Sequence, residues 1–163
     1  MEVLINGLNH TGEGIGRING KIVFVPKTIP GDVVLVGNLK DYKSYYKGEV
    51  IKYIKNSDDK IRNICPYYRE CGGCQLMDLS YLKQLDYKKD KVKNILKRYG
   101  NIDIDLDIIL SNKINGYRNK ITLKVENGKY GYYASKTHKL IEIDKCLLAE
   151  PAINRFIKAL GLG

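Results

Sequence analysis

The chain has 163 residues, of which 44% are apolar and 28% are charged. This length is enough for one ordinary domain, or for a small domain and part of another, and the apolar fraction excludes a largely disordered chain. A net charge of +10 and a pI near 9.3 are typical of proteins that bind a polyanion such as nucleic acid. The alternative is a genome that favours lysine codons.

Two features of the sequence bear on location and on where the charge lies. No apolar run approaches the ~20 residues that a membrane-spanning helix needs, and residues 1–7 lack the basic and apolar regions of a secretion signal. We therefore expect a cytoplasmic protein with no membrane contact. Residues 1–60 carry 9 basic and 7 acidic side chains, whereas the remainder carries 19 and 11, so the basic excess lies downstream.

Residues 1–57 are predicted to form a small β domain. Strands are expected over residues 2–8, 21–25, 32–39 and 47–55, separated by turns at 10–17 and at Pro30-Gly31. Four or five short strands at this spacing favour a small closed barrel of the OB kind. Gly12, Gly14 and Gly16 are interpreted as turn glycines, because no βαβ unit surrounds them.

A polar stretch at residues 56–60 separates this barrel from a second part, residues 58–163. Apolar residues on one face predict a helix over 79–99, capped by Asp78 or Ser80 and ended by Gly100. Further strands are expected at 108–110, 118–126, 130–134 and 139–143, with Asn127-Gly128 as a hairpin turn, before a final helix over 151–160. The predicted fold class is mainly β with α.

Four cysteines form the most specific pattern. Cys65, Cys71 and Cys74 lie on one loop, and Cys146 follows 72 residues after Cys74. In a reducing cytosol an even count favours a metal over disulfides. Structural zinc usually takes two short Cys-x-x-Cys pairs, whereas three ligands on one loop plus a distant fourth favour a [4Fe–4S] cluster. Zinc, and cysteines that bind nothing or form disulfides, remain the alternatives.

The residues around these cysteines fit a cluster loop. Gly72 and Gly73 carry no Cβ, so backbone N–H groups can approach the sulfurs, and Pro66 directly follows a ligand, as in ferredoxin motifs.

These motifs together resemble the uracil-5 RNA methyltransferases of the 23S ribosomal RNA type, over essentially the whole chain. Residues 10–16, 25–26 and 30–32 resemble a TRAM domain, an OB-like RNA-binding barrel. Residues 65–76 are similar to the family's cluster motif, 116–120 to the opening of its central domain, and 131–133 and 143–148 to the segments that deliver the fourth ligand.

The resemblance implies a TRAM barrel over 1–57, then an iron–sulfur loop, a helix and part of a β-rich central domain over 58–163. It also implies an S-adenosylmethionine-dependent methyltransferase domain that this sequence does not contain. The family attacks C6 of uracil with a cysteine, but all four cysteines here match cluster positions. We therefore expect no catalytic residue in residues 1–163, and S-adenosylmethionine only in the missing domain.

RNA is the expected partner, and ribosomal RNA is favoured over transfer RNA. Eight basic residues are predicted RNA contacts, and Arg118 is the strongest of them because it belongs to the matched Tyr-Arg-Asn-Lys motif. They are Arg17, Lys21, Lys43, Lys47, Arg118, Lys120, Lys136 and Lys139. Each could instead be a solvated surface charge. Tyr42, Tyr45 and Tyr46 are a candidate stacking surface or an ordinary β face.

Two other functions compete with the methyltransferase interpretation. The first is a stand-alone RNA-binding module with a structural iron–sulfur or zinc site and no catalysis. The second is a relative of the radical methylthiotransferases, which also pair a TRAM domain with a cluster. Their cluster loop has Cys-x-x-x-Cys-x-x-Cys spacing and their TRAM domain lies at the other end of the chain, so this sequence disfavours them.

Overall fold

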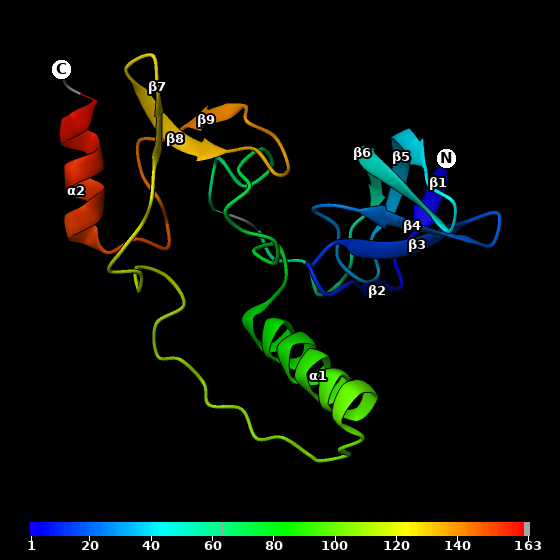
Figure 1. Ribbon diagram of the computed structural model, residues 1–163. Helices are drawn as coiled ribbons and strands as arrows, with labels where there is room; N and C mark the ends of the chain where they lie inside the picture. Colours follow the sequence, from blue (N-terminus) through cyan, green and yellow to red (C-terminus); the bar gives the residue numbers. More distant parts are fainter. Residues whose placement is uncertain (63, 162–163) are drawn as a thin grey trace. The chain divides into compact units, whose positions relative to one another are not determined.

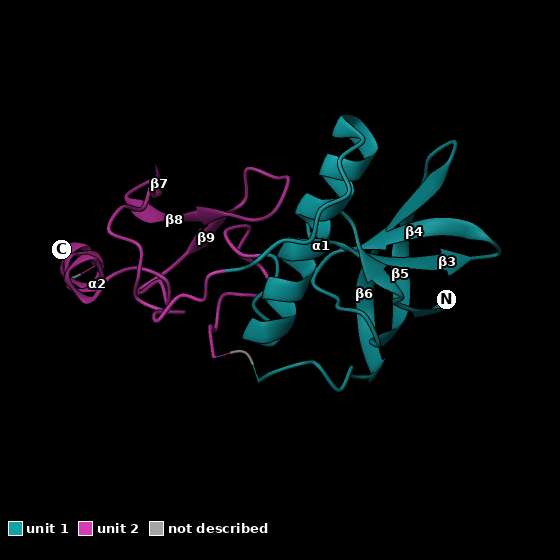
Figure 2. Ribbon diagram, turned by 90° about the horizontal axis from the view of Figure 1, so that it is seen from below, with its two compact units in different colours: residues 1–62, 75–108 teal, residues 63–74, 109–163 magenta. Residues whose placement is uncertain are grey.

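The computed structural model describes residues 1–62 and 64–161, which divide into two compact units (Figure 2). Unit 1 comprises Met1–Arg62 and Gln75–Ile108, and unit 2 comprises Asn63–Cys74 and Ile109–Gly163. Unit 1 therefore extends beyond the barrel predicted to end at residue 57, because it includes the long helix. The Tyr87 hydroxyl of that helix donates a hydrogen bond to the Asn9 carbonyl at 2.6 Å.

Unit 1 is built on a six-stranded sheet in the order β1-β5-β6-β4-β3-β2 (Figure 1). Its strands are β1 Glu2–Leu4, β2 Gly7–Leu8, β3 Gly14–Ile18, β4 Lys21–Val25, β5 Val33–Asp41 and β6 Tyr45–Lys55. Neighbours are antiparallel except β4 and β6, which run parallel. The long strand β6 pairs with β5 on one side and β4 on the other, so it joins the two halves of the OB-like sheet.

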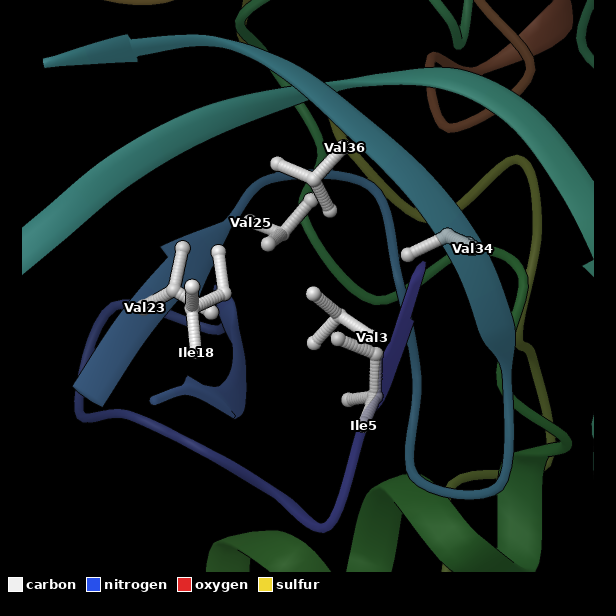
Figure 3. Close-up of a cluster of buried hydrophobic side chains, with 7 residues drawn as sticks. All are labelled: Val3, Ile5, Ile18, Val23, Val25, Val34 and Val36. Atoms are coloured by element: carbon white, nitrogen blue, oxygen red, sulfur yellow. The ribbon is translucent and has the colours of Figure 1, made fainter. Parts of the chain in front are cut away.

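Branched apolar side chains from four strands and the segment after β1 fill the core of unit 1 (Figure 3). These are Val3, Ile5, Ile18, Val23, Val25, Val34 and Val36. Val23 and Val25 alternate with partly exposed residues along β4, as expected for a strand with one buried face. Burying each such side chain contributes about 1.5–3 kcal/mol before entropy is counted.

Two of the three glycines interpreted as turn residues have another role. Gly14 and Gly16 lie in β3, and both are buried. A Cβ on Gly14 would meet the Thr28 side chain at 1.9 Å, and one on Gly16 would meet Val3 at 2.2 Å. The interpretation as turn glycines is therefore wrong for these two: they are small because the core leaves no space. Gly12, with φ +80°, does lie in a turn.

The long helix α1, Tyr81–Gly100, confirms the predicted helix within two residues at each end. Its N-cap position is Ser80, whose side chain makes no capping hydrogen bond. Its C-cap is Asn101 rather than Gly100, with φ 52° and ψ 31°. Asparagine tolerates this left-handed conformation, so it ends the helix where glycine was expected.

Unit 2 contains a three-stranded antiparallel sheet and a helix. The sheet order is β7-β8-β9, with β7 Lys124–Glu126, β8 Lys129–Tyr133 and β9 Leu140–Glu142, and the helix is α2 Pro151–Leu160. Asn127 and Gly128 both have positive φ, which confirms the predicted hairpin turn. The strand predicted at 108–110 is absent from the described residues, and only the end of the one predicted at 118–126 forms.

The predicted fold class, mainly β with an OB-like N-terminal sheet, is confirmed. Neither α1 nor α2, the helices of the described chain, has the length and apolar character needed to cross a membrane.

Candidate cysteine site and RNA interface

All four cysteines lie in unit 2. The loop that carries the first three docks on strand β8: Cys71 forms a bridge with Ala134, and the Gly72 amide donates to the Tyr133 carbonyl at 3.0 Å. A Cβ on Gly72 would lie 2.7 Å from that same carbonyl oxygen. Glycine at this position therefore lets the cysteine loop approach the sheet closely.

A second contact joins the loop to the segment that carries Cys146. The Tyr67 hydroxyl donates to Asp144 Oδ1 at 2.5 Å and accepts a hydrogen bond from the Asp144 amide at 3.2 Å. Burial raises the pKa of Tyr67, and the hydrogen bond to the Asp144 carboxylate raises it further. The phenol therefore stays protonated at neutral pH and holds two segments together that are 77 residues apart in sequence.

Helix α2 positions the backbone of Cys146 through one side chain. Asn154 Oδ1 accepts from the Cys146 amide at 2.8 Å, and Asn154 Nδ2 donates to the carbonyls of Cys146 at 3.0 Å and Ala149 at 3.2 Å. One amide side chain thus satisfies three backbone groups of the turn after β9. Asn154 was not predicted from the sequence, because nothing local to it indicates this contact.

The thiol of Cys74 is close enough to the other three cysteines to interact with them electrostatically. Burial raises its pKa to about 11, and the thiols of Cys71, Cys146 and Cys65 contribute to this rise, whereas Arg118 opposes it. A set of neighbouring thiols disfavours its own ionisation unless positive charge is supplied. The thiols of Cys65, Cys71 and Cys146, from two segments that are distant in sequence, therefore lie within electrostatic range of Cys74.

A hydrogen-bond donor reaches one of the sulfurs. The Gly73 amide donates to Cys71 Sγ at 3.3 Å, so a backbone N–H approaches a sulfur here, as predicted. Burial raises the pKa of Tyr132, and the nearby Cys146 thiol raises it further. Donors to cysteine sulfur are among the features that tune iron–sulfur clusters.

The four cysteine side chains are not arranged as the ligands of one metal ion. Within residues 1–62 and 64–161, no three or more histidine, cysteine, aspartate or glutamate side chains are grouped as they would be around one metal. A zinc ion would require its thiolates at Zn–S distances of ~2.3 Å. The donor set, four thiols with one backbone N–H directed at a sulfur, has the chemistry that an iron–sulfur cluster requires.

Replacing Asn154 by alanine is expected to loosen the turn that carries Cys146. The substitution removes three hydrogen bonds and leaves partly buried backbone groups unsatisfied, at a cost of roughly 1–3 kcal/mol. Amide hydrogen exchange of residues 146–149 should accelerate accordingly. Lys158→Ala, an exposed change on the same helix, is the matched control. Unchanged exchange in Asn154→Ala would show that other contacts hold this turn.

The four basic residues predicted on the barrel lie on three of its strands and one loop. Arg17 is exposed on β3 and donates to the Gly20 carbonyl at 2.6 Å, and Lys21 on β4 forms an ion pair with Asp41. Lys43 is exposed at the tip between β5 and β6, and Lys47 follows on β6. The cation of Lys21 already has a carboxylate partner, which makes it the weakest RNA candidate of the four.

The four basic residues predicted in unit 2 are all exposed. Arg118 is exposed but lies within electrostatic range of the cysteines. Partial burial lowers its pKa, whereas Tyr117 and then the thiols of Cys74 and Cys146 raise it, and the net result is a raised pKa. Lys139 forms an exposed ion pair with Glu70 at 3.5 Å. Lys120 and Lys136 are exposed. Arg118 is therefore a neighbour of the cysteine site as well as a candidate RNA contact.

Unit 1 also contains a groove that was not predicted from the sequence. A cavity of about 830 Å³ lies between α1 and the loop after β2, and its lining includes Lys83, Lys91, Arg98 and Tyr99. Lys91 Nζ donates to the His10 carbonyl at 2.8 Å, which ties the helix to the loop. The signal available in the sequence was the run of lysines along α1, from Lys83 to Lys97.

Comparison with known proteins places these features in a family context. The model of the TRAM domain matches residues 1–51. The chain is 37% identical over 166 residues to an uncharacterized RNA methyltransferase of Clostridium acetobutylicum, covering 96% of this chain and 36% of the relative. It is 28% identical to a 23S rRNA (uracil(1939)-C(5))-methyltransferase of Vibrio parahaemolyticus, covering 93% and 36%. The chain thus spans about a third of the length of these curated relatives.

A solved structure has the same fold over almost all of this chain. The Pyrococcus abyssi tRNA (uracil-54, C5)-methyltransferase, in complex with S-adenosyl-L-homocysteine, superposes with a TM-score of 0.73 at 27% identity. The match covers 99% of this chain and 36% of that one. The N-terminal residues therefore form a TRAM domain, and the chain is homologous to RNA methyltransferases.

Proposed function

We propose that this chain is the RNA-binding, [4Fe–4S]-containing N-terminal part of an S-adenosylmethionine-dependent RNA uracil-5 methyltransferase that acts on 23S ribosomal RNA. The observation that carries the proposal is the combination of a TRAM domain with four cysteines on two distant segments, three of which lie within electrostatic range of the fourth, Cys74. A uracil-5 methyltransferase of 23S RNA among the relatives supports the reaction and the substrate.

In this proposal the thiols of Cys65, Cys71, Cys74 and Cys146 hold the cluster. When bound, the cluster would join the cysteine loop to the turn after β9 through iron–sulfur bonds. The protein's own contacts already prepare this link, because the Gly72 amide and the Tyr67 hydroxyl dock the loop on the sheet of unit 2. The cluster is thus proposed to fix the shape of an RNA-binding surface rather than to transfer electrons.

The four cysteines are the only cysteines of residues 1–163. If all of them bind the cluster, a thiolate that attacks uracil C6 must come from another part of the enzyme. The test is methylation of uracil in RNA transcripts by the complete enzyme with S-adenosylmethionine. Methyl transfer to C5 of uracil in a 23S transcript supports the proposal, whereas methyl transfer by residues 1–163 alone would overturn this division of roles.

Transfer RNA is the second candidate substrate, because the solved neighbour is a tRNA (uracil-54, C5)-methyltransferase. Equal amounts of a 23S fragment and a tRNA transcript, offered together to the complete enzyme, separate the two. Methylation of the tRNA transcript alone would contradict the ribosomal assignment while leaving the uracil-5 chemistry intact.

RNA binding by residues 1–163 is expected to weaken steeply with salt. Each phosphate neutralised by a lysine or arginine contributes about −0.7 to −0.9 to the slope of log K against log salt. Replacing Lys43 and Lys47 by alanine should reduce the slope by about 1.4–1.8. Lys52→Ala, an exposed lysine farther along β6, is the matched control and should leave the slope nearly unchanged. A salt-independent affinity would contradict the assigned RNA surface.

A further inference from the structure

The tip of the β5–β6 hairpin carries an ordered group of aromatic side chains. Tyr42 and Tyr45 lie parallel, with ring centroids 4.8 Å apart and an interplanar angle of 14°. The Tyr42 amide donates to the Tyr45 carbonyl at 2.9 Å, so a tight turn fixes the pair. The ring of Phe24, on β4, packs edge-on against the ring of Tyr45, with centroids 5.2 Å apart and an interplanar angle of 60°. We call Tyr42 and Tyr45 the tyrosine stack.

The stack has one end anchored in the sheet and one end exposed. Tyr45 is half-buried and is held by Phe24 of the neighbouring strand, whereas Tyr42 is 40% exposed. Here the outermost ring is the most accessible aromatic residue of the group, although it is locked in orientation.

The ammonium of Lys47 lies near both rings of the tyrosine stack. Lys47 Nζ is 5.5 Å from the Tyr42 centroid and 5.9 Å from the Tyr45 centroid. Because the two centroids are only 4.8 Å apart, these distances place the ammonium beside the stack, level with the space between the rings. The cation therefore flanks the stack and does not lie on its outer face.

The charge around the stack favours an anionic ligand. Lys43 is exposed within the turn itself, and Lys40 lies opposite Lys47 in the register of β5 and β6. The acidic residue of this tip, Asp41, is paired with Lys21. A partly exposed ring with Lys47 beside it, and with Lys43 and Lys40 on the same hairpin tip, matches the requirements for an unpaired base and the phosphates next to it. Base stacking on an aromatic ring is combined with backbone electrostatics in single-strand binding.

We propose that the outer face of Tyr42 is a stacking site for one unpaired RNA base, with Lys43 and Lys47 contacting the adjoining phosphates. This inference rests on the proposed RNA-binding function and assigns to it a defined subsite and a preference for unpaired over paired RNA. A base in a duplex has both faces occupied by its neighbours, so a paired RNA would gain only from the lysines.

The test is the binding of residues 1–163 to a short single-stranded RNA that contains one 2-aminopurine, whose fluorescence falls when it stacks on an aromatic ring. Tyr42→Leu keeps an apolar side chain but removes the ring, and should weaken binding about ten-fold and abolish the quenching. Tyr42→Phe should restore both. Tyr99→Leu, at an exposed tyrosine on α1, is the matched control. A fully paired duplex should bind Tyr42→Leu and the unmodified chain equally.

Three outcomes distinguish the subsite from the wider function. Loss of quenching and affinity in Tyr42→Leu, with rescue by Tyr42→Phe, supports the subsite. Unchanged quenching and affinity in Tyr42→Leu, while the chain binds RNA in a salt-dependent manner, overturns the subsite but leaves the proposed function standing. Absence of binding to either RNA by the unmodified chain overturns both.

Discussion

Gly131→Ala should unfold the sheet of unit 2. A Cβ on Gly131 would lie 1.9 Å from the Ile141 carbonyl oxygen and 2.7 Å from its carbonyl carbon, both on the neighbouring strand β9. Because the obstacle is backbone, no side-chain rotation can relieve the contact, and the strands must separate by about 1 Å. Overpacking of this kind costs about 3 kcal/mol or more at a site that cannot adjust, which a three-stranded sheet tolerates poorly.

The consequence for the cysteine site follows from what β8 and β9 hold. Strand β8 supplies Tyr132, whose pKa the nearby Cys146 thiol raises, and Tyr133, whose carbonyl accepts from the Gly72 amide. Strand β9 leads directly to Cys146. We expect amide hydrogen exchange to become rapid throughout 129–146 in Gly131→Ala.

Gly7→Ala is the matched control, since Gly7 is also a strand glycine but has open space where a Cβ would lie. Native protection of residues 129–146 in Gly131→Ala would mean that the sheet can widen without loss, contrary to this interpretation.

Asp32→Ala should destabilise the barrel of unit 1 by about 3–5 kcal/mol, as expected when one partner of a buried ion pair is removed. Asp32 is 0% exposed, and its Oδ2 lies 2.7 Å from Lys60 Nζ, which also lies 3.8 Å from the centre of the Tyr53 ring. The carboxylate further accepts from the amides of Ile29 at 3.0 Å and Ser57 at 2.9 Å. Alanine would leave a buried ammonium and two amides without this acceptor.

Hydrogen exchange of the β3–β5 amides measures this loss within unit 1. Asp41→Ala removes the carboxylate of the exposed Lys21–Asp41 pair and is the matched control, with an expected cost below about 1 kcal/mol. Equal effects of the two substitutions would mean that the buried pair is worth no more than a surface pair.

The parts of the fold that were predicted correctly rest on local patterns. The short apolar run Lys21–Val25 and the Asn127-Gly128 turn have near-neighbour causes, and both elements form as expected. The strand predicted at 108–110 fails for a physical reason. Apolar residues give a strand only when another strand supplies the hydrogen bonds, and the described residues provide no partner at Ile108–Leu110.

The contacts that the sequence could not indicate join segments that are far apart in the chain. Asp32 was interpreted as the start of a strand. Its carboxylate in fact accepts hydrogen bonds from the Ser57 amide and from Lys60 Nζ, which lie 25 and 28 positions farther along the chain. Asn154 acts on a turn eight residues earlier through side-chain geometry alone. The spacing of the cysteines carries chemical information that asparagine and aspartate lack, so a joint site for Cys146 and the three loop thiols could be predicted from the sequence. That site stays a prediction, and the structure adds that Cys146 lies within electrostatic range of Cys74.

The most direct test of the proposed cluster is iron, sulfide and zinc analysis, with an absorbance spectrum, on residues 1–163 purified without oxygen. We predict about four iron and four sulfide per chain, a broad band near ~400 nm, and loss of all three signals in Cys146→Ser but not in the neighbouring surface variant Lys145→Ala. One zinc per chain without sulfide, or iron content unaffected by Cys146→Ser, would contradict the proposal.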